Sequence, residues 1–419
     1  MIVTRLWKLF LSLSICICSL VIGTFPASAA TAASSGITVL MDGYPLAFPT
    51  PPVIEKGTTL VPFRAISEAM GVDVQWDGPT QTITAIQTNE QDQKTVKMTL
   101  GNPQIFVNGQ TVGLAVAPYE RNGSTLIPLR FFSEQFGAKV SWDESTKTVS
   151  IVSPARDMYS LAFYAISSFA QKDLISRFDS VAFGWSRIDK DGSLTLSGSD
   201  FYWPQPAGST TPETIIGEAK AAGTTPYLMV FAADGSGELT TLLTDRSLRE
   251  KAIAGIVKIV QEKGLEGVVL DFEGLGMNGQ ATEIKQDYNE FVQLLSGQIK
   301  PLGAKLTLVL HPLNGAYQGY DYASLGKLAD DLVIMAYAYE NEKGPEPMDK
   351  VDQAIRLALA KVPKEKLILG ISMGSENDQS VNQKIGLAKR YGLKGFALWR
   401  LGLISQAAMS RVQEAVSMK

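Results

Sequence analysis

The sequence predicts an α/β protein in which a (β/α)8 TIM barrel follows a smaller, duplicated α+β domain. From Met158 onward, short apolar runs alternate with amphipathic stretches, a pattern typical of β/α units around a parallel sheet. Residues 156–419 are close to the usual length of such a barrel, roughly 250 residues. Two similar segments precede this part of the chain, which indicates a duplicated unit.

The composition limits the classes of function. The chain has 419 residues, 45% of them hydrophobic and 19% charged, which is typical of globular domains and excludes a disordered polymer. A net charge of −4 does not favour a nucleic-acid surface, so we expect no nucleic-acid partner. The chain contains one histidine, His311, and two cysteines, Cys16 and Cys18.

The N-terminal segment has the features of a secretory signal. Arg5 and Lys8 precede an apolar run, and small residues at positions 27–29 offer a cleavage site. We expect residues 1–29 to be a signal peptide of a secreted or envelope protein that has no membrane segment after cleavage; an uncleaved anchor is the alternative. Because both cysteines lie in this segment, the mature chain would lack disulfides and thiolate ligands. We expect no metal and no cofactor, since one histidine cannot build a histidine-rich zinc site.

The duplicated unit lies in the expected first domain, residues 36–152. Gly57-Thr-Thr-Leu-Val-Pro-Phe-Arg aligns with Gly123-Ser-Thr-Leu-Ile-Pro-Leu-Arg, 66 residues further on, and both copies continue without a gap to Trp-Asp. Each copy predicts a strand that ends at a proline, a short helix and a hairpin. The residues expected to be buried on the two helices are Ile66, Met70, Phe132 and Phe136.

This pattern resembles the domain named after the N-terminus of copper amine oxidases. The resemblance implies a binding or spacing module, and we expect it to contact the cell-wall surface. It does not imply copper, because residues 36–152 contain neither His nor Cys. The Trp, Arg and Glu shared by the two copies could form a ligand site, but we interpret them as packing and pairing residues kept by the duplication.

Eight apolar runs are the candidate strands of the barrel, residues 156–419. Amphipathic segments lie between them, such as Leu248 to Lys263, and a last helix is expected over about residues 404–418. Polar residues at the carboxyl ends of the strands are the candidate site residues, because barrel active sites lie there. The candidate strands are residues 160–165, 180–184, 225–231, 267–272, 305–310, 331–336, 366–372 and 395–399.

Two acidic residues end the fourth candidate strand. Asp271 and Glu273 are two positions apart, so they face the same side of an extended strand. Two carboxylates near an apolar interior raise the pKa of one of them, as a general acid requires. On spacing alone, a pair of strand-end acids that face solvent remains the alternative.

The segment resembles the fourth-strand motif of glycoside hydrolase family 18, D-G-x-D-x-D-x-E. Glu273 matches the final Glu, which is the general acid in the family, and Asp271 matches the Asp before it. Glu266 stands at the first Asp position, and Val269 replaces the middle Asp. The similarity is greatest to the spore-wall and envelope hydrolases of the family, which often lack the middle Asp.

Two further motifs carry the same resemblance. Met335-Ala336-Tyr337 matches the Met-x-Tyr signature of the sixth strand, although Ala338 follows where the family has Asp. Trp399 matches the tryptophan that ends the eighth strand and lies under the sugar in the family. The short stretch between the seventh and eighth strands leaves no room for the extra domain of many chitinases, which implies an open groove. The remaining candidate substrate-binding residues are Tyr339, His311 and Trp185.

The resemblance implies a substrate-assisted, retaining hydrolysis of β-1,4 linkages in a polysaccharide that contains N-acetylglucosamine, peptidoglycan rather than chitin. The substrate's acetamido oxygen would attack the anomeric carbon while Glu273 protonates the leaving oxygen. Asp271 would orient the acetamide, and Tyr337 would hydrogen-bond its oxygen. Trp399 would stack under the sugar.

The departures at Val269 and Ala338 leave an alternative: an envelope protein that binds cell-wall or chitin-type glycans with weak or no catalysis.

Two segments match other functional motifs letter for letter, but the residues around them argue against those functions. Residues 274–279 resemble a dinucleotide-binding loop, but the two acids before them would repel a pyrophosphate. Residues 370–374 resemble a nucleophile elbow, but the histidine should follow the serine, and His311 precedes it.

Overall fold

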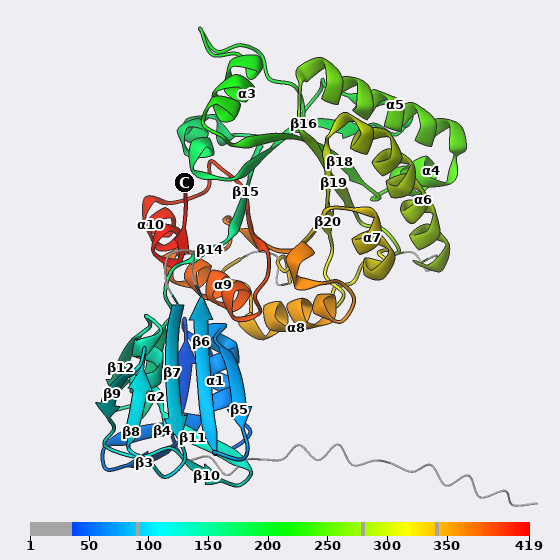
Figure 1. Ribbon diagram of the computed structural model, residues 1–419. Coiled ribbons are helices and arrows are strands. Elements are labelled where there is room, and N and C mark those ends of the chain that lie inside the picture. Colours follow the sequence, from blue (N-terminus) through cyan, green and yellow to red (C-terminus); the bar gives the residue numbers. More distant parts are fainter. Residues whose placement is uncertain (1–35, 89–92, 278–280, 340–342) are drawn as a thin grey trace, which may run out of the picture.

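The structure is a computed structural model that describes residues 36–88, 93–277, 281–339 and 343–419. The expected signal peptide lies outside the described residues. The described chain forms a closed parallel barrel surrounded by helices, with a smaller β-rich domain beside it (Figure 1). The predicted fold class is therefore confirmed.

Within the described residues, eight parallel strands close the barrel. They are β15 (Tyr159–Ala165), β16 (Ser180–Ile188), β18 (Thr225–Ala233), β19 (Gly267–Glu273), β20 (Lys305–Leu310), β21 (Asp331–Ile334), β22 (Leu367–Ser372) and β23 (Gly395–Trp399). Neighbours pair in chain order, and β15 also pairs with β23, which closes the sheet. A two-residue strand, β17 (Leu194–Thr195), extends β16 as a hairpin.

All eight candidate runs form strands, but the sixth is shorter than predicted. β21 ends at Ile334 rather than Ala336, because the Ala336 N–H donates to the Ile334 carbonyl (2.8 Å) and the chain turns. The strand therefore ends before the Met-x-Tyr signature begins, and Tyr337 lies on the loop that follows.

Helices cover the outside of the barrel (Figure 1). The predicted amphipathic segment forms part of α5, which buries Ile253, Ile256 and Val260. The last helix, α10, ends earlier than expected, because buried Val416 adopts an extended conformation and pairs with Arg156. The helices are η1 (Ser168–Arg177), α3 (Pro212–Ala221), α4 (Glu238–Thr244), α5 (Arg246–Lys263), α6 (Ala281–Ile299), η2 (Lys300–Leu302), α7 (Tyr322–Leu328), α8 (Met348–Leu359), η3 (Lys364–Lys366), α9 (Asp378–Arg390) and α10 (Gln406–Ala415). The short strands β14 (Arg156–Asp157) and β24 (Val416–Ser417) join the two ends of the barrel segment.

The barrel has two apolar layers, and strand β19 contributes to both. Val268, Leu270 and Phe272 pack in the layer between the sheet and the helices. Val269 packs inside the barrel with the inward side chains of other strands. Because side chains alternate along a strand, Asp271 and Glu273 lie on the inward side above Val269.

The N-terminal domain contains the two copies of the predicted unit. Each has a strand that ends at a proline, a helix that begins directly after it, and a hairpin. The four helix residues expected to be buried are all buried. Its elements are β1 (Thr38–Met41), β2 (Tyr44–Pro45), β3 (Val53–Glu55), β4 (Thr58–Pro62), α1 (Phe63–Met70), β5 (Asp73–Asp77), β6 (Thr82–Thr88), β7 (Gln93–Thr99), β8 (Gln104–Val107), β9 (Gln110–Gly113), β10 (Tyr119–Arg121), β11 (Ser124–Pro128), α2 (Leu129–Gln135), β12 (Lys139–Asp143) and β13 (Thr148–Val152).

The two copies are joined through their central strands. β4 and β11 pair antiparallel, with Val61 opposite Ile127. The duplication also extends further toward the N-terminus than the aligned segments, since β1, β2 and β3 have counterparts in β8, β9 and β10 at the same offset of 66 residues. Strand β7 lies between the copies and pairs with β6 and β8.

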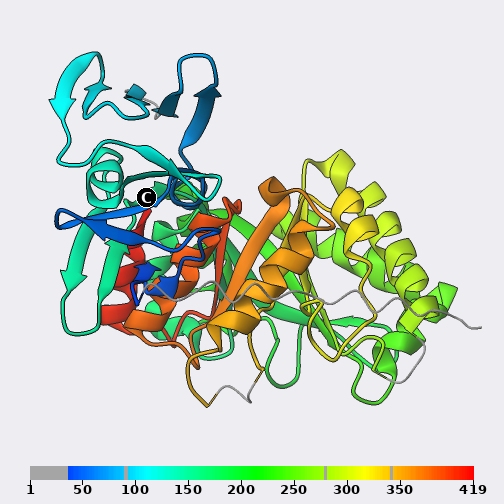
Figure 2. The same cartoon turned by 90° about the horizontal axis from the view of Figure 1, so that it is seen from below.

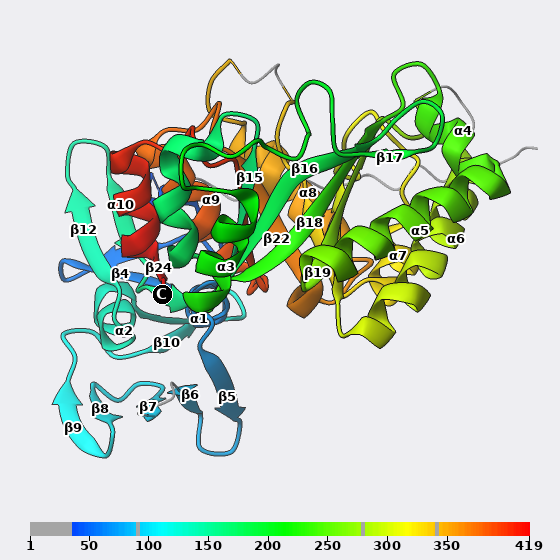
Figure 3. The same cartoon turned by 90° about the horizontal axis from the view of Figure 1, so that it is seen from above.

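The N-terminal domain packs against α9 on the flank of the barrel (Figures 2 and 3). The Arg390 guanidinium donates to the carbonyls of Pro45, Met41 and Tyr44 at 3.0 to 3.1 Å. Arg156 donates to the carbonyls of Lys389 and Met70. The five-stranded sheet β5–β9 points away from the end of the barrel where the β16–β17 hairpin lies (Figure 3), so the carboxyl ends of the strands stay uncovered by this domain.

Candidate active site

Strand β19 brings the acidic pair to the carboxyl end of the barrel. Gly267 begins the strand where a Cβ would lie 2.6 Å from the Tyr227 ring, so only glycine fits without a shift. Gly274 ends it with φ +85°, a left-handed conformation that turns the chain away directly after Glu273. The pair therefore lies in the last three residues of the strand, directly before the loop.

Burial changes the acidity of Asp271. The Asp271 side chain is only 3% exposed, and its Oδ1 has no hydrogen-bond partner among the described residues. Burial, followed by the charge of Glu273, raises the pKa of Asp271 well above its usual range. The folded protein therefore favours the protonated form of Asp271 more than an exposed aspartate would, and the two carboxyls interact.

The residues around Asp271 are apolar. Val269, at the position of the family's middle Asp, is fully buried and packs with Val309 and Val333. In the parallel register, Phe231 of β18 lies beside Asp271 on one side and Val309 on the other. The loss of the middle Asp thus leaves Glu273 as the charged group that perturbs Asp271.

Tyr337 and Trp399 belong to the same end of the barrel. Both are partly buried and pack on the apolar interior that Val269 helps to form. The Tyr337 ring lies over β22, where a Cβ on Gly370 would be 3.1 Å from Tyr337 Cε1. Trp399 ends β23 and makes an edge contact with Phe163, with ring centroids 5.3 Å apart. The register and the shared interior thus bring Asp271, Glu273, Tyr337 and Trp399 around one rim.

His311 and Tyr339 lie on the loops after β20 and β21. The His311 ring packs 4.2 Å from the Tyr317 ring, and burial lowers the pKa of His311 to about 4. His311 is therefore neutral at neutral pH and cannot serve as the proton donor there. The Tyr339 hydroxyl donates to Asn314 Oδ1 at 2.9 Å, which ties the two loops together.

The structure contradicts the expectation that Trp185 binds substrate. Its side chain is 3% exposed and lies in the core between the sheet and the helices. There it stacks on Phe183 at 4.2 Å and meets Trp203 edge-on at 5.2 Å. The sequence misleads here because β16 extends four residues beyond its predicted end, so Trp185 is a mid-strand core residue rather than a strand-end residue.

The sequence also leaves some rim residues unrecognised. Phe231 stacks on Phe201 at 4.4 Å, and Phe201 lies 6.4 Å from Trp399, which completes an aromatic wall. A groove of about 730 Å³ runs beside it between the β16–β17 hairpin and the end of β18. Phe231 could have been found as the last residue of the third candidate strand, but Phe201 lies on a long irregular connection without any sequence signal.

Two further observations concern metal binding and membrane-spanning helices. Within the described residues, no group of three His, Cys, Asp or Glu side chains is placed to hold a metal ion. In the same part of the chain, no helix has both the length and the apolar character needed to cross a membrane.

A (β/α)8 barrel whose fourth strand ends in an acidic pair beside aromatic side chains has the arrangement of a barrel-type glycoside hydrolase. Residues 160–376 match the family model of glycosyl hydrolases family 18, and the chain belongs to this family. Residues 40–151 match the model of the copper amine oxidase N-terminal domain. Both resemblances noted in the sequence are therefore confirmed.

The two relatives described below align with only part of this chain. The cortical fragment-lytic enzyme of Bacillus anthracis is 25% identical over 175 residues, which are 38% of this chain and 39% of that protein. Exochitinase 1 of Streptomyces olivaceoviridis is 26% identical over 186 residues, 40% of this chain and 30% of that protein. The matched region thus spans about two fifths or less of these relatives.

Solved structures share the barrel fold. The spore cortex-lytic enzyme SleL of Bacillus cereus superposes with a TM-score of 0.52 at 18% identity, over 64% of this chain and 77% of that one. A chitinase from Chromobacterium violaceum gives a TM-score of 0.52 at 22% identity, over 62% of this chain and 98% of that one. At these identities the likeness shows the fold alone.

Proposed function

We propose that the protein is a glycosidase that cleaves β-1,4 linkages next to N-acetylglucosamine units by a substrate-assisted, retaining mechanism. The observation that carries this proposal is the Asp271–Glu273 pair at the carboxyl end of β19, with a raised pKa for buried Asp271. We propose peptidoglycan rather than chitin as the substrate, because the relatives include cortical fragment-lytic enzymes.

The proton of the pair is the one that the reaction needs. The acetamido oxygen attacks the anomeric carbon, the bond to the leaving oxygen breaks, and Glu273 delivers a proton to that oxygen. Positive charge develops on the acetamide nitrogen in this step. This charge stabilises an ionised Asp271 next to it, so the proton of the pair lies on Glu273, from which it passes to the leaving oxygen. Glu273 then takes a proton from the water that opens the cyclic intermediate.

The aromatic rim provides the binding surface for the sugar. Tyr337 donates a hydrogen bond to the acetamido oxygen and orients it for attack, while Trp399 packs against the apolar face of the ring. The aromatic wall of Phe201 and Phe231 continues toward the groove beside β18, which offers room for neighbouring sugars of a polymer.

The test uses purified protein with peptidoglycan and with chitin oligomers, and mass spectrometry of new reducing ends. We expect products with an intact N-acetyl group from peptidoglycan and their loss in Glu273→Gln, which should still sediment with the polymer. Release of product by Glu273→Gln at the wild-type rate would overturn the site. If the wild-type protein binds both polymers and releases nothing, the protein is a glycan-binding member of the family rather than an enzyme.

We also propose that the N-terminal domain holds the protein on the cell wall. A groove of about 420 Å³ in this domain is lined by Ile54, Arg130, Trp142 and Glu144 among others. Trp142 donates to Glu144 Oε2 at 2.7 Å, which fixes an aromatic face beside charged groups, a combination suited to sugars. In the Glu273→Gln background, Trp142→Ala should reduce sedimentation with insoluble peptidoglycan, and unchanged sedimentation would contradict this role.

Export is a further part of the proposal. It rests on the signal-like segment at residues 1–29 and on a wall polymer as substrate. N-terminal sequencing of the protein recovered from culture medium and from the envelope fraction tests it, with a start after position 29 as the expected result.

A further inference from the structure

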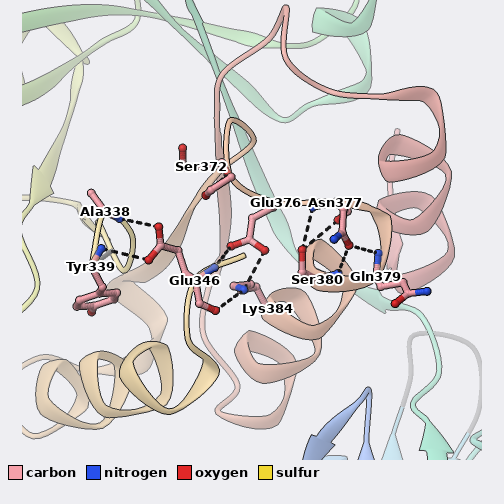
Figure 4. A network of polar contacts seen from close by, with 10 residues as sticks. Ala338, Tyr339, Glu346, Ser372, Glu376, Asn377, Gln379, Ser380 and Lys384 are labelled. Atoms are coloured by element: carbon pink, nitrogen blue, oxygen red, sulfur yellow. Dashed lines mark hydrogen bonds and ion pairs between the residues drawn. The ribbon is translucent and has the colours of Figure 1, made fainter. Parts of the chain in front are cut away.

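The loop between β21 and α8 carries Tyr337, and one buried carboxylate holds it. Glu346, near the end of this loop, reaches back to its beginning. Its carboxylate accepts hydrogen bonds from the N–H of Ala338 at 2.9 Å and from the N–H of Tyr339 at 3.1 Å (Figure 4). The residue is only 3% exposed, so water does not compete for these two bonds.

The backbone at Ala338 explains why an anion is needed there. Ala338 has φ +60°, a left-handed conformation that is unfavourable for a residue with a Cβ. Such a residue turns successive N–H groups toward one point and creates a small anion-binding concavity. Glu346 supplies the anion, and the conformation of the residue directly after Tyr337 therefore depends on its charge.

Glu346 is itself fixed by the chain segment that leads into α9. Its N–H donates to Glu376 Oε1 at 3.0 Å, and its carbonyl accepts from Lys384 Nζ at 2.9 Å. Lys384 and Glu376 form an ion pair at 2.9 Å, with 3% and 1% of their side chains exposed (Figure 4). A buried pair with hydrogen bonds on both sides restricts motion more than an exposed pair does.

Tyr337 is thus held on both sides. Its ring lies over Gly370, and the peptide that follows it is held by Glu346. We propose that Glu346, supported by Glu376 and Lys384, is a positioning residue: it fixes the Tyr337 hydroxyl where this group orients the acetamido oxygen for attack on the anomeric carbon. This inference rests on the proposed function and adds to it a group that does not touch the substrate.

A double-mutant cycle tests the inference. Glu346→Gln keeps the shape of the side chain but removes its charge and one of its two acceptor oxygens. We expect kcat on an acetamido-oligosaccharide to fall by about 10- to 100-fold, with KM changed by less than about threefold. In the Tyr337→Phe background, Glu346→Gln should lower kcat by less than about twofold, because the group it positions is already gone. A full additional loss in that background would overturn the inference.

A matched control separates positioning from stability. Asp331 begins the same strand at the opposite end of the barrel, is 1% exposed, and binds Lys394 Nζ at 2.5 and 2.6 Å. Asp331→Asn should lower the melting temperature and leave kcat unchanged below the transition. If Glu346→Gln does not fold, Glu376→Gln, which keeps an acceptor for the Glu346 N–H, should show the same loss of kcat and the same non-additivity.

Hydrogen exchange makes the test independent of activity. The amides of Ala338 and Tyr339 should exchange slowly in the wild-type protein and at least tenfold faster in Glu346→Gln, with no change in the Asp331→Asn variant. An inactive wild-type protein with this exchange pattern would contradict the proposed function alone. Equal exchange in the wild type and Glu346→Gln would contradict the positioning role.

Discussion

At the scale of single residues, the acidic pair shows how an apolar setting changes a carboxyl group. Asp271 lies inside the barrel beside Glu273 and above Val269, and burial is the main reason that its pKa is raised. The spacing of the two acids in the sequence predicts that they face one side. Their burial could not be predicted, because the spacing equally allows a pair that faces solvent.

A pH-dependent stability follows from this raised pKa. Between the pKa of Asp271 in the unfolded chain, about 3.9, and its higher value in the folded protein, the folded state binds more protons. The free energy of unfolding therefore falls as the pH rises through this window. Asp271→Asn removes this ionisation. The free energy of unfolding of the variant, measured relative to that of the wild type, should therefore rise by at most about 1.4 kcal/mol per pH unit through this window.

Thermal unfolding of the wild type and Asp271→Asn from pH 4 to pH 8 measures this difference. Asp330→Asn serves as a comparison, because it removes a carboxyl directly before β21, at the opposite end of the barrel. A difference between the wild type and Asp271→Asn that stays constant over this range would contradict the raised pKa. Asp271→Asn should also lose most of its glycosidase activity, since it cannot ionise next to the acetamide.

At the scale of elements, the eight strands are predictable because each is an apolar run between helical stretches. The end of β21 is not, because the Ala336 N–H turns back to the Ile334 carbonyl, and the left-handed Ala338 that follows is held by Glu346, eight residues further along the chain. The same holds for Trp185, whose burial follows from the extension of β16. The type and order of the elements can be predicted from the sequence, whereas the exact ends of the elements depend on contacts in the folded protein.

Gly370 offers a prediction at this scale. A Cβ at this position in β22 would lie 2.8 Å from the Ile334 carbonyl oxygen and 3.1 Å from the Tyr337 ring. Gly370→Ala should therefore destabilise the protein by about 1–3 kcal/mol and move the ring. We expect kcat to fall at least tenfold with a folded barrel, measured by steady-state kinetics and circular dichroism. Gly344→Ala, at an open position on the loop, is the control, and an equal effect of both would contradict the argument.

At the scale of the whole molecule, the contact between the two domains rests on backbone carbonyls that bind arginine side chains. Arg390 of α9 donates to three carbonyls around β1 and β2. Asp42, in the turn between these strands, accepts from the Ser153 N–H at 2.9 Å and from the Ser153 hydroxyl at 2.7 Å. The Arg390 bonds hold the N-terminal domain on the flank of the barrel and away from its mouth, whereas the Asp42 bonds fix the end of this domain where the connection to the barrel begins.

Replacing the arginine should loosen the domains without affecting the chemistry. Arg390→Met removes about 2 kcal/mol of charged hydrogen bonding and keeps much of the apolar contact. We expect faster proteolysis of the connection around residues 153–157 and unchanged kcat on a short soluble oligosaccharide. Arg246→Met, whose exposed partner Glu250 lies on the same helix, is the control and should not alter proteolysis. A loss of kcat in Arg390→Met would show that the domain contact supports the site.

The sequence alone determined the barrel, the duplicated domain and the identity of the acidic pair, because these follow from periodicity, repetition and a local motif. The tertiary structure decided which candidates meet. It brought Tyr337 and Trp399 to the rim that holds Asp271 and Glu273, placed Trp185 in the core, and joined Glu346 to the loop of Tyr337. The physical reason is that a strand's own residues set its pattern, whereas burial, pKa and loop conformation depend on side chains far away in the chain.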